Sequence, residues 1–336
     1  MPDYFVFGGC LRSAIDFSEL PEARGMSPSW SLEIGALGDD AGGETLGHLA
    51  LSPTCTTRIS RRGRTYRYEH SCTGIFEVSD EGRRIVYEPS ANANAESLRM
   101  DVVARVLLLC VEQQSVLWLH GSAVAIGGGG IGFLGFSGAG KSTMGLLLAQ
   151  SGAQPISDDT LPVAIGSSID IWATDYTVRV NDDSRAMVAA STRTLRRDTD
   201  GKFVIQHGAL VDGAHDHAER SSAERYPLRA LYLMSSAEQS LGAGDTGAMA
   251  VRERVRPIDL VRALMPHVKV GPIVRDSAPA LILFHIAALA ERVPVYRLAV
   301  RRDLARAREL AAEVMSWHTE QETSPADSTP TASYVS

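Results

Sequence analysis

The stretch Trp118–Asp159, WLHGSAVAIGGGGIGFLGFSGAGKSTMGLLLAQSGAQPISDD, decides most of what can be predicted about the fold. Within it, the segment GFSGAGKS at 135–142 matches the pattern G-x-x-x-x-G-K-[ST]. Glycines at such spacing let backbone N–H groups surround a phosphate at the positive end of the next helix. An apolar segment precedes the loop and a helix-forming segment, TMGLLLAQ, follows it. This context predicts a strand, a phosphate-binding loop and a helix.

The residues of this loop receive specific roles in the predicted nucleotide site. Lys141 is expected to reach the β- and γ-phosphates, and the Ser142 hydroxyl is expected to bind Mg²⁺. Lys141 is one of only three lysines among 33 basic residues, the others being Lys202 and Lys269. The residues expected to contact ATP are Gly135, Ser137, Gly138, Ala139, Gly140, Lys141, Ser142 and Thr143.

Two acidic residues, Asp158 and Asp159, follow the next predicted strand, QPIS. They come only a helix and a turn after the loop, which predicts that both reach the same site from an adjacent strand. Mg²⁺ prefers oxygen ligands, so one carboxylate can hold the metal while the other accepts a proton from an attacking hydroxyl. The alternative is that SDDT only forms a turn and caps the next segment.

His120 precedes the strand that must pair with the one feeding the loop. Only the glycines Gly127–Gly130 link VLWLHGSAVAI, at 116–126, to GIGFLGFS, at 130–137, and this link is too short for a crossover helix. The two strands are therefore predicted to be antiparallel neighbours. Depending on the register, His120 lies beside the aspartates or at the far end of the hairpin, and the spacing leaves both arrangements open.

Composition and patterning divide the chain into three parts. Residues 1–92 read as short strands, the first of them YFVFGGCL, joined by turns such as SRRGRT and SDEGRR. They predict a β-rich N-terminal domain, expected to dock a peptide. Residues 93–318 alternate strands and helices around the loop and predict an α/β catalytic domain. Residues 319–336 lack the apolar residues needed for a core and predict a disordered tail.

The overall composition excludes several classes of protein. With 44% hydrophobic and 22% charged residues, 336 residues can bury a sizeable core, and a net charge of −7 disfavours nucleic acid as a partner. No apolar run is long enough to span a membrane, and the N-terminus does not resemble a secretory signal. The cysteines at 10, 55, 72 and 110 form no C-x-x-C pair, which predicts reduced thiols in a cytoplasmic protein.

The order of His-Gly, short hairpin, G-x-S-G-x-G-K-S, helix and Asp-Asp resembles the catalytic domain of HPr kinase/phosphorylase and its relatives. The resemblance covers about Leu117–Val163 well and the chain to about Trp317 more loosely. It implies a PEP-carboxykinase-like P-loop kinase domain that transfers the γ-phosphate of ATP to a serine of a small protein. It also implies that Asp158 is the general base, that Asp159 is its metal-linked neighbour, and that His120 lies near the transferred phosphate.

The chain departs from that family at two places. Bifunctional members carry Glu-x-Arg-Gly after the second hairpin, whereas this chain has DYTVRVNDDS. Arg179 is the candidate for the family's arginine, and Asp175, Asp182 and Asp183 are the candidates for the place of the glutamate. The resemblance therefore does not extend to the reverse, phosphorolytic activity. The strand-rich N-terminal part, opening with YFVFGGCL, is similar instead to HPr-kinase-related proteins of biosynthetic gene clusters. Some of these phosphorylate lasso peptide precursors on serine, and the resembling enzymes form homo-oligomers.

Three functional classes compete for this sequence. A serine kinase explains the loop, the aspartates and the histidine together, acting on a peptide precursor or, as an HPr(Ser) kinase/phosphorylase, in carbon regulation. A transport or switch NTPase would need an LSGGQ-like or N-K-x-D motif, and neither appears. A non-catalytic nucleotide-binding sensor is the third class.

Three further groups of residues were weighed as parts of a site. Arginines in RISRRGRTYRYEH, among them Arg61 and Arg64, suggest either a solvated strand or a sheet edge that docks an extended acidic peptide. Lys202 is a candidate for the acceptor pocket. His215 and His217 have the look of a metal pair, but a solvated loop is the favoured interpretation.

Overall fold

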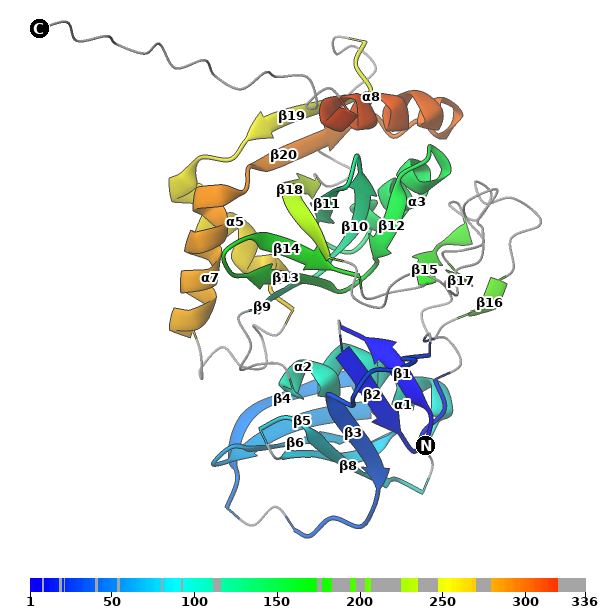
Figure 1. Ribbon diagram of the computed structural model, residues 1–336, viewed down its shortest axis with the longest axis vertical. Helices are drawn as coiled ribbons and strands as arrows, with labels where there is room; N and C mark the ends of the chain where they lie inside the picture. Colours follow the sequence, from blue (N-terminus) through cyan, green and yellow to red (C-terminus); the bar gives the residue numbers. More distant parts are fainter. Residues whose placement is uncertain are drawn as a thin grey trace, which may run out of the picture.

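The computed structural model has a mixed α/β, β-rich fold with two large sheets (Figure 1). It describes residues 1–7, 9–17, 20, 22–39, 42–52, 55–79, 81–91, 93–110, 116–173, 177–182, 194–197, 203–206, 225–234, 247–269 and 279–319. The predicted tail beyond 319 and the candidates Lys202, His215 and His217 lie outside these residues.

The first sheet is built from the N-terminal strands, in the order β1-β2-β3-β8-β7-β6-β5-β4. Its strands are β1 (Asp3–Val6), β2 (Gly9–Ser13), β3 (Trp30–Ile34), β4 (Glu44–Ser52), β5 (Cys55–Arg62), β6 (Thr65–His70), β7 (Gly74–Ser79) and β8 (Arg84–Pro89). Along β7 buried and half-buried residues alternate, because successive side chains of a strand face opposite sides of the sheet.

One N-terminal segment differs from its prediction. The run YFVFGGCL, expected to form a single strand, folds into the antiparallel pair of β1 and β2. The chain reverses at Phe7, whose φ is +50°, in the left-handed region that non-glycine residues seldom adopt. The predicted turns in SRRGRT and SDEGRR are confirmed, since they join β5 to β6 and β7 to β8.

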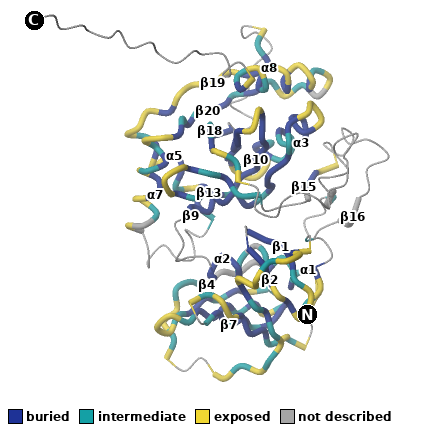
Figure 2. Tube along the Cα trace, in the orientation of Figure 1, coloured by how far each residue is buried: buried dark blue, intermediate teal, exposed yellow. Residues whose placement is uncertain are grey.

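A helical segment packs on the first sheet and leads into the second. It consists of α1 (Ala95–Asp101), a π-helical turn (Val102–Val106) and α2 (Leu107–Cys110). Val102, Val106 and Leu107 are fully buried against the aromatic residues of the sheet. Trp118 of the following strand joins the same cluster, so the hydrophobic core continues from the first sheet toward the second (Figure 2).

The second sheet runs in the order β12-β10-β11-β18-β14-β13-β9, with β20 pairing with both β18 and β19. Its strands are β9 (Val116–Leu119), β10 (Gly121–Ile126), β11 (Gly129–Leu134), β12 (Gln154–Ser157), β13 (Leu161–Ile165), β14 (Ile169–Trp172), β18 (Arg225–Met234), β19 (Ala250–Arg254) and β20 (Val295–Val300). A small third sheet has the order β15-β17-β16, from β15 (Thr177–Val180), β16 (Thr194–Arg197) and β17 (Phe203–Gln206). The hairpin predicted at the start of this part is confirmed for β10 and β11, which pair antiparallel. The segment at 116–126 is not one strand as expected, because it breaks at His120 and β9 pairs with β13 instead. β13 and β14 form a second antiparallel hairpin.

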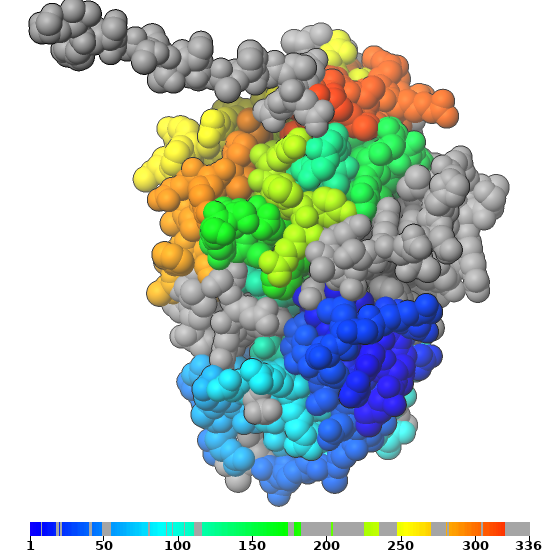
Figure 3. Space-filling view, in the orientation of Figure 1, coloured from blue at the N-terminus to red at the C-terminus, as the bar shows by residue number. Residues whose placement is uncertain are grey.

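Helices pack against the second sheet through two separate apolar clusters. One cluster includes α3 (Lys141–Gln150) and α8 (Ala307–Thr319), and the other includes α5 (Leu260–Leu264) and α7 (Pro279–Arg292). Short 3-10 turns at Pro257–Asp259, Met265–His267 and Leu304–Arg306 flank these helices. Figure 3 shows the residues of the first sheet, in blue and cyan, gathered in one part of the surface and those of the second sheet in another.

The cysteines differ from their prediction. Cys55 and Cys72 are joined by a disulfide, because the pairing of β5 with β6 brings the start of β5 next to the turn after β6. The expectation of reduced thiols is wrong for this pair, whereas Cys10 and Cys110 are free and buried. Within the described residues, every helix falls short of the length and apolar character that crossing a bilayer requires.

Candidate active site

The glycine-rich loop joins the buried strand β11 to the first turn of α3. Gly138 and Gly140 have φ values of +79° and +95°, which a side chain at either position would disfavour. The Lys141 ammonium donates to the carbonyl oxygens of Gly135, at 2.8 Å, and Phe136, at 3.2 Å. The side chain therefore folds back along the loop, and the residue is only 8% exposed. The loop thus keeps the Lys141 ammonium close to its own backbone, as in loops whose backbone N–H groups surround a phosphate.

Asp158 follows β12 and points at the start of α3. Its Oδ1 accepts a hydrogen bond of 2.8 Å from the Ser142 hydroxyl, and its Oδ2 accepts one of 2.9 Å from the Arg179 backbone N–H. Asp158 is 4% exposed, and this burial raises the pKa of its carboxyl even though both hydrogen bonds favour the ionised form. A carboxylate of raised pKa beside the loop is chemically suited to accept a proton.

Asp159 lies in a different electrostatic environment from its neighbour. Burial disfavours its charge, but the Lys269 ammonium, 2.6 Å away, and the nearby His120 and Arg179 together lower the pKa of Asp159. Its backbone has a φ of +70°, which turns the two consecutive aspartates in different directions. The pair thus combines one carboxyl of raised pKa with one of lowered pKa.

His120 lies beside the aspartates rather than at the far end of the hairpin. Gly121 pairs with Leu134 in the register of β10 and β11, so the end of the hairpin that carries His120 is also the end that enters the loop. The His120 Nδ1 lies 3.1 Å from the carbonyl oxygen and 3.4 Å from Oδ1 of Asp159. Burial, with the charges of Lys141 and Lys269, outweighs the Asp159 carboxylate and lowers the pKa of His120. The structure settles the register that local spacing left open.

Among the described residues, several near the site were not predicted to belong to it, including Asn181, which lines the cavity. Lys269 lies beside Asp159 and also donates to Thr160, and the buried His267 accepts a 2.6 Å bond from the His120 backbone N–H through its carbonyl. Arg302 donates to the carbonyl oxygens of Gly138 and Ala139. In the sequence, Lys269 stands out only because lysine is rare in this chain. It lies so far from the loop along the chain that no local pattern connects the two.

These side chains surround a cavity of about 480 Å³. Its lining includes most of the predicted site residues, namely His120, Ser137, Gly138, Gly140, Lys141, Ser142, Thr143, Asp158 and Asp159, together with Arg179, Asn181 and Arg302. Ala139 is buried, and Gly135 lines a second cavity of about 790 Å³ on another side of the loop. The second cavity also contacts Phe136, which is 70% exposed, and the basic side chains of Arg262 and Arg297.

No protein-family model matches the chain, and no curated protein matches it. Among solved structures, the chain is distantly similar to the Hpr(Ser) kinase/phosphatase from Coxiella burnetii. The sequence identity is 12% and the TM-score 0.30, over 59% of this chain and 86% of that one.

Of the two interpretations weighed for Arg61 and its neighbours, the sheet edge, which was the less favoured one, does not hold. Arg61 and its neighbours on β5 are not at an edge, because β4 pairs with β5 on one side and β6 pairs with it on the other. Arg61 also lies 3.4 Å from Glu44, and Arg64 lies 3.0 Å from Glu81. β5 and β6 are therefore each paired on both sides, so neither can accept an added strand.

The residues that follow the second hairpin include Arg179, the candidate for the family's arginine, and the candidates for its glutamate. The Arg179 backbone N–H donates to Asp158, and its guanidinium lies 3.9 Å from Oδ1 of Asp159. Asp182 is exposed, and Asp175 and Asp183 lie outside the described residues.

Proposed function

We propose that this chain is an ATP-dependent serine kinase of the HPr-kinase-like type, with a PEP-carboxykinase-like P-loop domain at 93–318. One observation carries the proposal. The lysine and serine of the glycine-rich loop, two aspartates of opposite pKa shift and a histidine surround a single cavity. Phosphoryl transfer needs charge stabilisation and one base at the same point, and these residues supply both.

The residues that are present fit a nucleotide and a magnesium ion. Gly138 and Gly140 leave room for phosphate oxygens, Lys141 supplies a positive charge, and Ser142 with Asp159 supplies oxygen ligands for Mg²⁺. Bound ATP would supply the phosphoryl group, and Mg²⁺ would neutralise part of its charge. The anion is further favoured by Arg179 and Arg302, which line the same cavity.

The two aspartates are proposed to have different roles, one as the base and one as a metal ligand. Asp158, buried and of raised pKa, would accept the proton of the acceptor serine hydroxyl. Asp159, kept ionised by Lys269, would lie on the metal side. His120 would hold the backbone of Asp159 through its Nδ1 and leave its other ring nitrogen free to contact the phosphoryl group.

The acceptor is proposed to be a peptide or small protein bearing a serine, for example the precursor of a ribosomally made lasso peptide. The second cavity supports this, since it adjoins the loop and combines the exposed Phe136 ring with two arginines, Arg262 and Arg297, and one acidic residue, Glu253. The apolar ring and the excess of basic over acidic side chains suit a peptide with an apolar residue and an acidic neighbour. Phe136→Ala should raise the KM for the peptide several-fold and leave nucleotide affinity unchanged. Arg61→Glu, far from the loop, is the matched control, and an unchanged KM in Phe136→Ala would contradict this placement.

The direct test is mass spectrometry of candidate precursor peptides and of HPr after incubation with the chain, ATP and Mg²⁺. A kinase adds one phosphate to a serine and releases ADP only when the acceptor is present. Phosphorylation of HPr but not of precursor peptides would instead assign the chain to carbon regulation. Tight nucleotide binding without acceptor-dependent ADP release, across both acceptor sets, would make it a sensor and overturn the proposal.

A further inference from the structure

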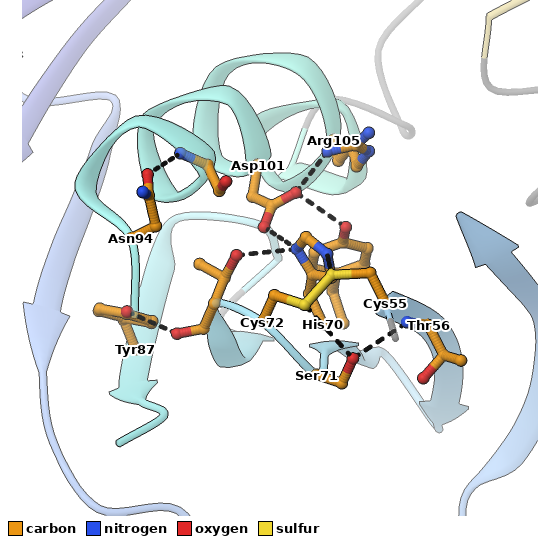
Figure 4. Close-up of polar contacts among 12 residues, drawn as sticks. Cys55, Thr56, His70, Ser71, Cys72, Tyr87, Asn94, Asp101 and Arg105 are labelled. Carbon is orange, nitrogen blue, oxygen red and sulfur yellow. Dashed lines mark hydrogen bonds and ion pairs between the residues drawn. A yellow bond between two sulfur atoms is a disulfide. The ribbon is translucent and has the colours of Figure 1, made fainter. Parts of the chain in front are cut away.

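Three side chains with metal-ligating atoms meet in the first sheet, well away from the glycine-rich loop in sequence. Cys55 begins β5, His70 ends β6, and Cys72 lies in the turn that follows β6. One ligand atom from each, two sulfurs and a ring nitrogen, lie within 4.8 Å of one another (Figure 4). The antiparallel register explains this meeting, because Thr57 pairs with His70 and so brings the start of β5 beside the turn.

The imidazole of His70 is oriented by a buried carboxylate. Its Nδ1 lies 2.5 Å from Oδ2 of Asp101, which is 0% exposed. A carboxylate only accepts hydrogen bonds, so Nδ1 carries the hydrogen and Nε2 presents a lone pair. That Nε2 lies 3.4 Å from the sulfur of Cys55. A metal-binding histidine commonly donates its second nitrogen to a carboxylate in this way, which fixes both the tautomer and the ring orientation.

The carboxylate is itself held on every described side. Asp101 accepts a 2.9 Å bond from the Tyr68 hydroxyl and forms an ion pair with Arg105, one turn further along the helical segment. With three partners, the Asp101 carboxylate is held in one place, and rigid support of this kind for a ligand's second nitrogen strengthens metal binding.

The cluster is also accessible from solvent. Cys55 and Cys72 are half-buried, and His70 lines a cavity of about 400 Å³ together with His48, Thr56 and Ser71. Two thiolates and one imidazole are ligands that Zn²⁺ prefers, and a three-ligand site leaves a fourth tetrahedral position for water. The disulfide alone does not explain why the His70 ring nitrogen points at the sulfur of Cys55, whereas a shared metal ion would.

We propose that Cys55, His70 and Cys72 form a binding site for a thiophilic divalent cation of the Zn²⁺ class when the disulfide is reduced. Reduction by a dithiol or phosphine adds two electrons and two protons to the disulfide and yields two thiols. Binding of the cation then releases those protons and forms two metal–thiolate bonds and one metal–imidazole bond. The disulfide and the metal site are alternative states of the same two sulfurs, since a sulfur in the disulfide is no longer a thiolate.

The test titrates the reduced full-length chain with Co²⁺ in the absence of oxygen. We expect thiolate-to-cobalt charge transfer and the visible absorption of a tetrahedral site, saturating at one ion per chain and displaced by Zn²⁺. Cys55→Ser and Cys72→Ser should each remove the charge-transfer band or halve it, and His70→Ala should weaken binding about ten- to a hundred-fold. His48→Ala, an exposed histidine lining the same cavity, should bind as the parent does. Absence of the band in the reduced parent, or equal affinity in His70→Ala, would overturn the proposal.

A second measurement needs no variant and so does not depend on whether a variant folds. The reduced parent chain is treated with iodoacetamide with and without Zn²⁺, and its cysteine peptides are then quantified by mass spectrometry. Zn²⁺ should slow the alkylation of Cys55 and Cys72 at least ten-fold, while the buried Cys10 and Cys110 serve as internal references. Equal alkylation of Cys55 and Cys72 with and without Zn²⁺ would also overturn the proposal.

Discussion

The ammonium of Lys269 lies 2.6 Å from Oδ2 of Asp159, although 110 positions separate the two residues in sequence. The Lys269 backbone N–H also donates to the carbonyl of Trp118, so the lysine is held against β9. This contact keeps one of two adjacent carboxyls ionised while burial raises the pKa of the other. The difference between the two aspartates therefore originates in a residue from a distant part of the chain.

Replacing Lys269 should change the pH dependence of the proposed transfer. Lys269→Met removes the charge that lowers the pKa of Asp159, so that carboxyl should protonate at a higher pH than in the parent. The acidic limb of kcat/KM should then move to higher pH. Lys269→Arg keeps the charge and should leave the limb closer to that of the parent. Superimposable profiles for parent and Lys269→Met would show that Asp159 is not required in its ionised form.

Asp158→Asn should separate chemistry from binding. The amide is nearly the same size but cannot accept the acceptor proton as a base, so turnover should fall by about two to four orders of magnitude. Nucleotide affinity, measured by calorimetry with ATP and Mg²⁺, should stay within a few-fold of the parent. The hydrogen bond between Ser142 and Asp158 makes the opposite outcome informative, because a large loss of Mg²⁺-dependent affinity would place Asp158 on the metal side.

Gly140→Ala tests the left-handed turn of the loop. Its φ of +95° should make the alanine cost about 1 kcal/mol of folding stability. It should also weaken nucleotide binding, because relief of the strain moves backbone donors away from the phosphates. Gly152→Ala is a matched control, since Gly152 has a φ of +100° and no atom near the added methyl. Both variants should lose stability in urea, but only Gly140→Ala should lose affinity, and equal affinity in the two would rule out a positioning effect of this turn.

Burial of His267 should make stability depend on pH. Burial, with the charges of Lys141 and His120, lowers the pKa of His267 to about 4. Between that value and its ordinary pKa of about 6.5, the unfolded chain binds the proton and the folded chain does not. The free energy of unfolding should therefore fall as the pH drops through this window, by on the order of 2–3 kcal/mol from this residue. Urea unfolding at several pH values should show a shallower slope for His267→Gln, and identical slopes would contradict the buried neutral state.

The local elements of the fold were predictable where the signals lie close together in the sequence. The loop at 135–142, the helix after it and the hairpins around it follow from glycine spacing and apolar periodicity. The reversal of the chain at Phe7 was not predicted, because a non-glycine residue within an apolar strand pattern gives no sign of a turn. The sequence could not exclude a sheet edge at Arg61, since charge on one strand does not reveal which strands pair with it.

The sequence by itself determined the glycine-rich loop between a strand and a helix, because the geometry of that loop depends on consecutive backbone angles and on glycine. It also determined that two carboxylates follow at short range. Only the tertiary structure decided that His120 lies at the end of its hairpin that enters the loop. It also decided that Lys269 keeps Asp159 ionised and that the His70 ring lies close to the sulfurs of Cys55 and Cys72. Strand register and long-range packing set these contacts, and they depend on how the whole hydrophobic core is arranged rather than on spacing along the chain.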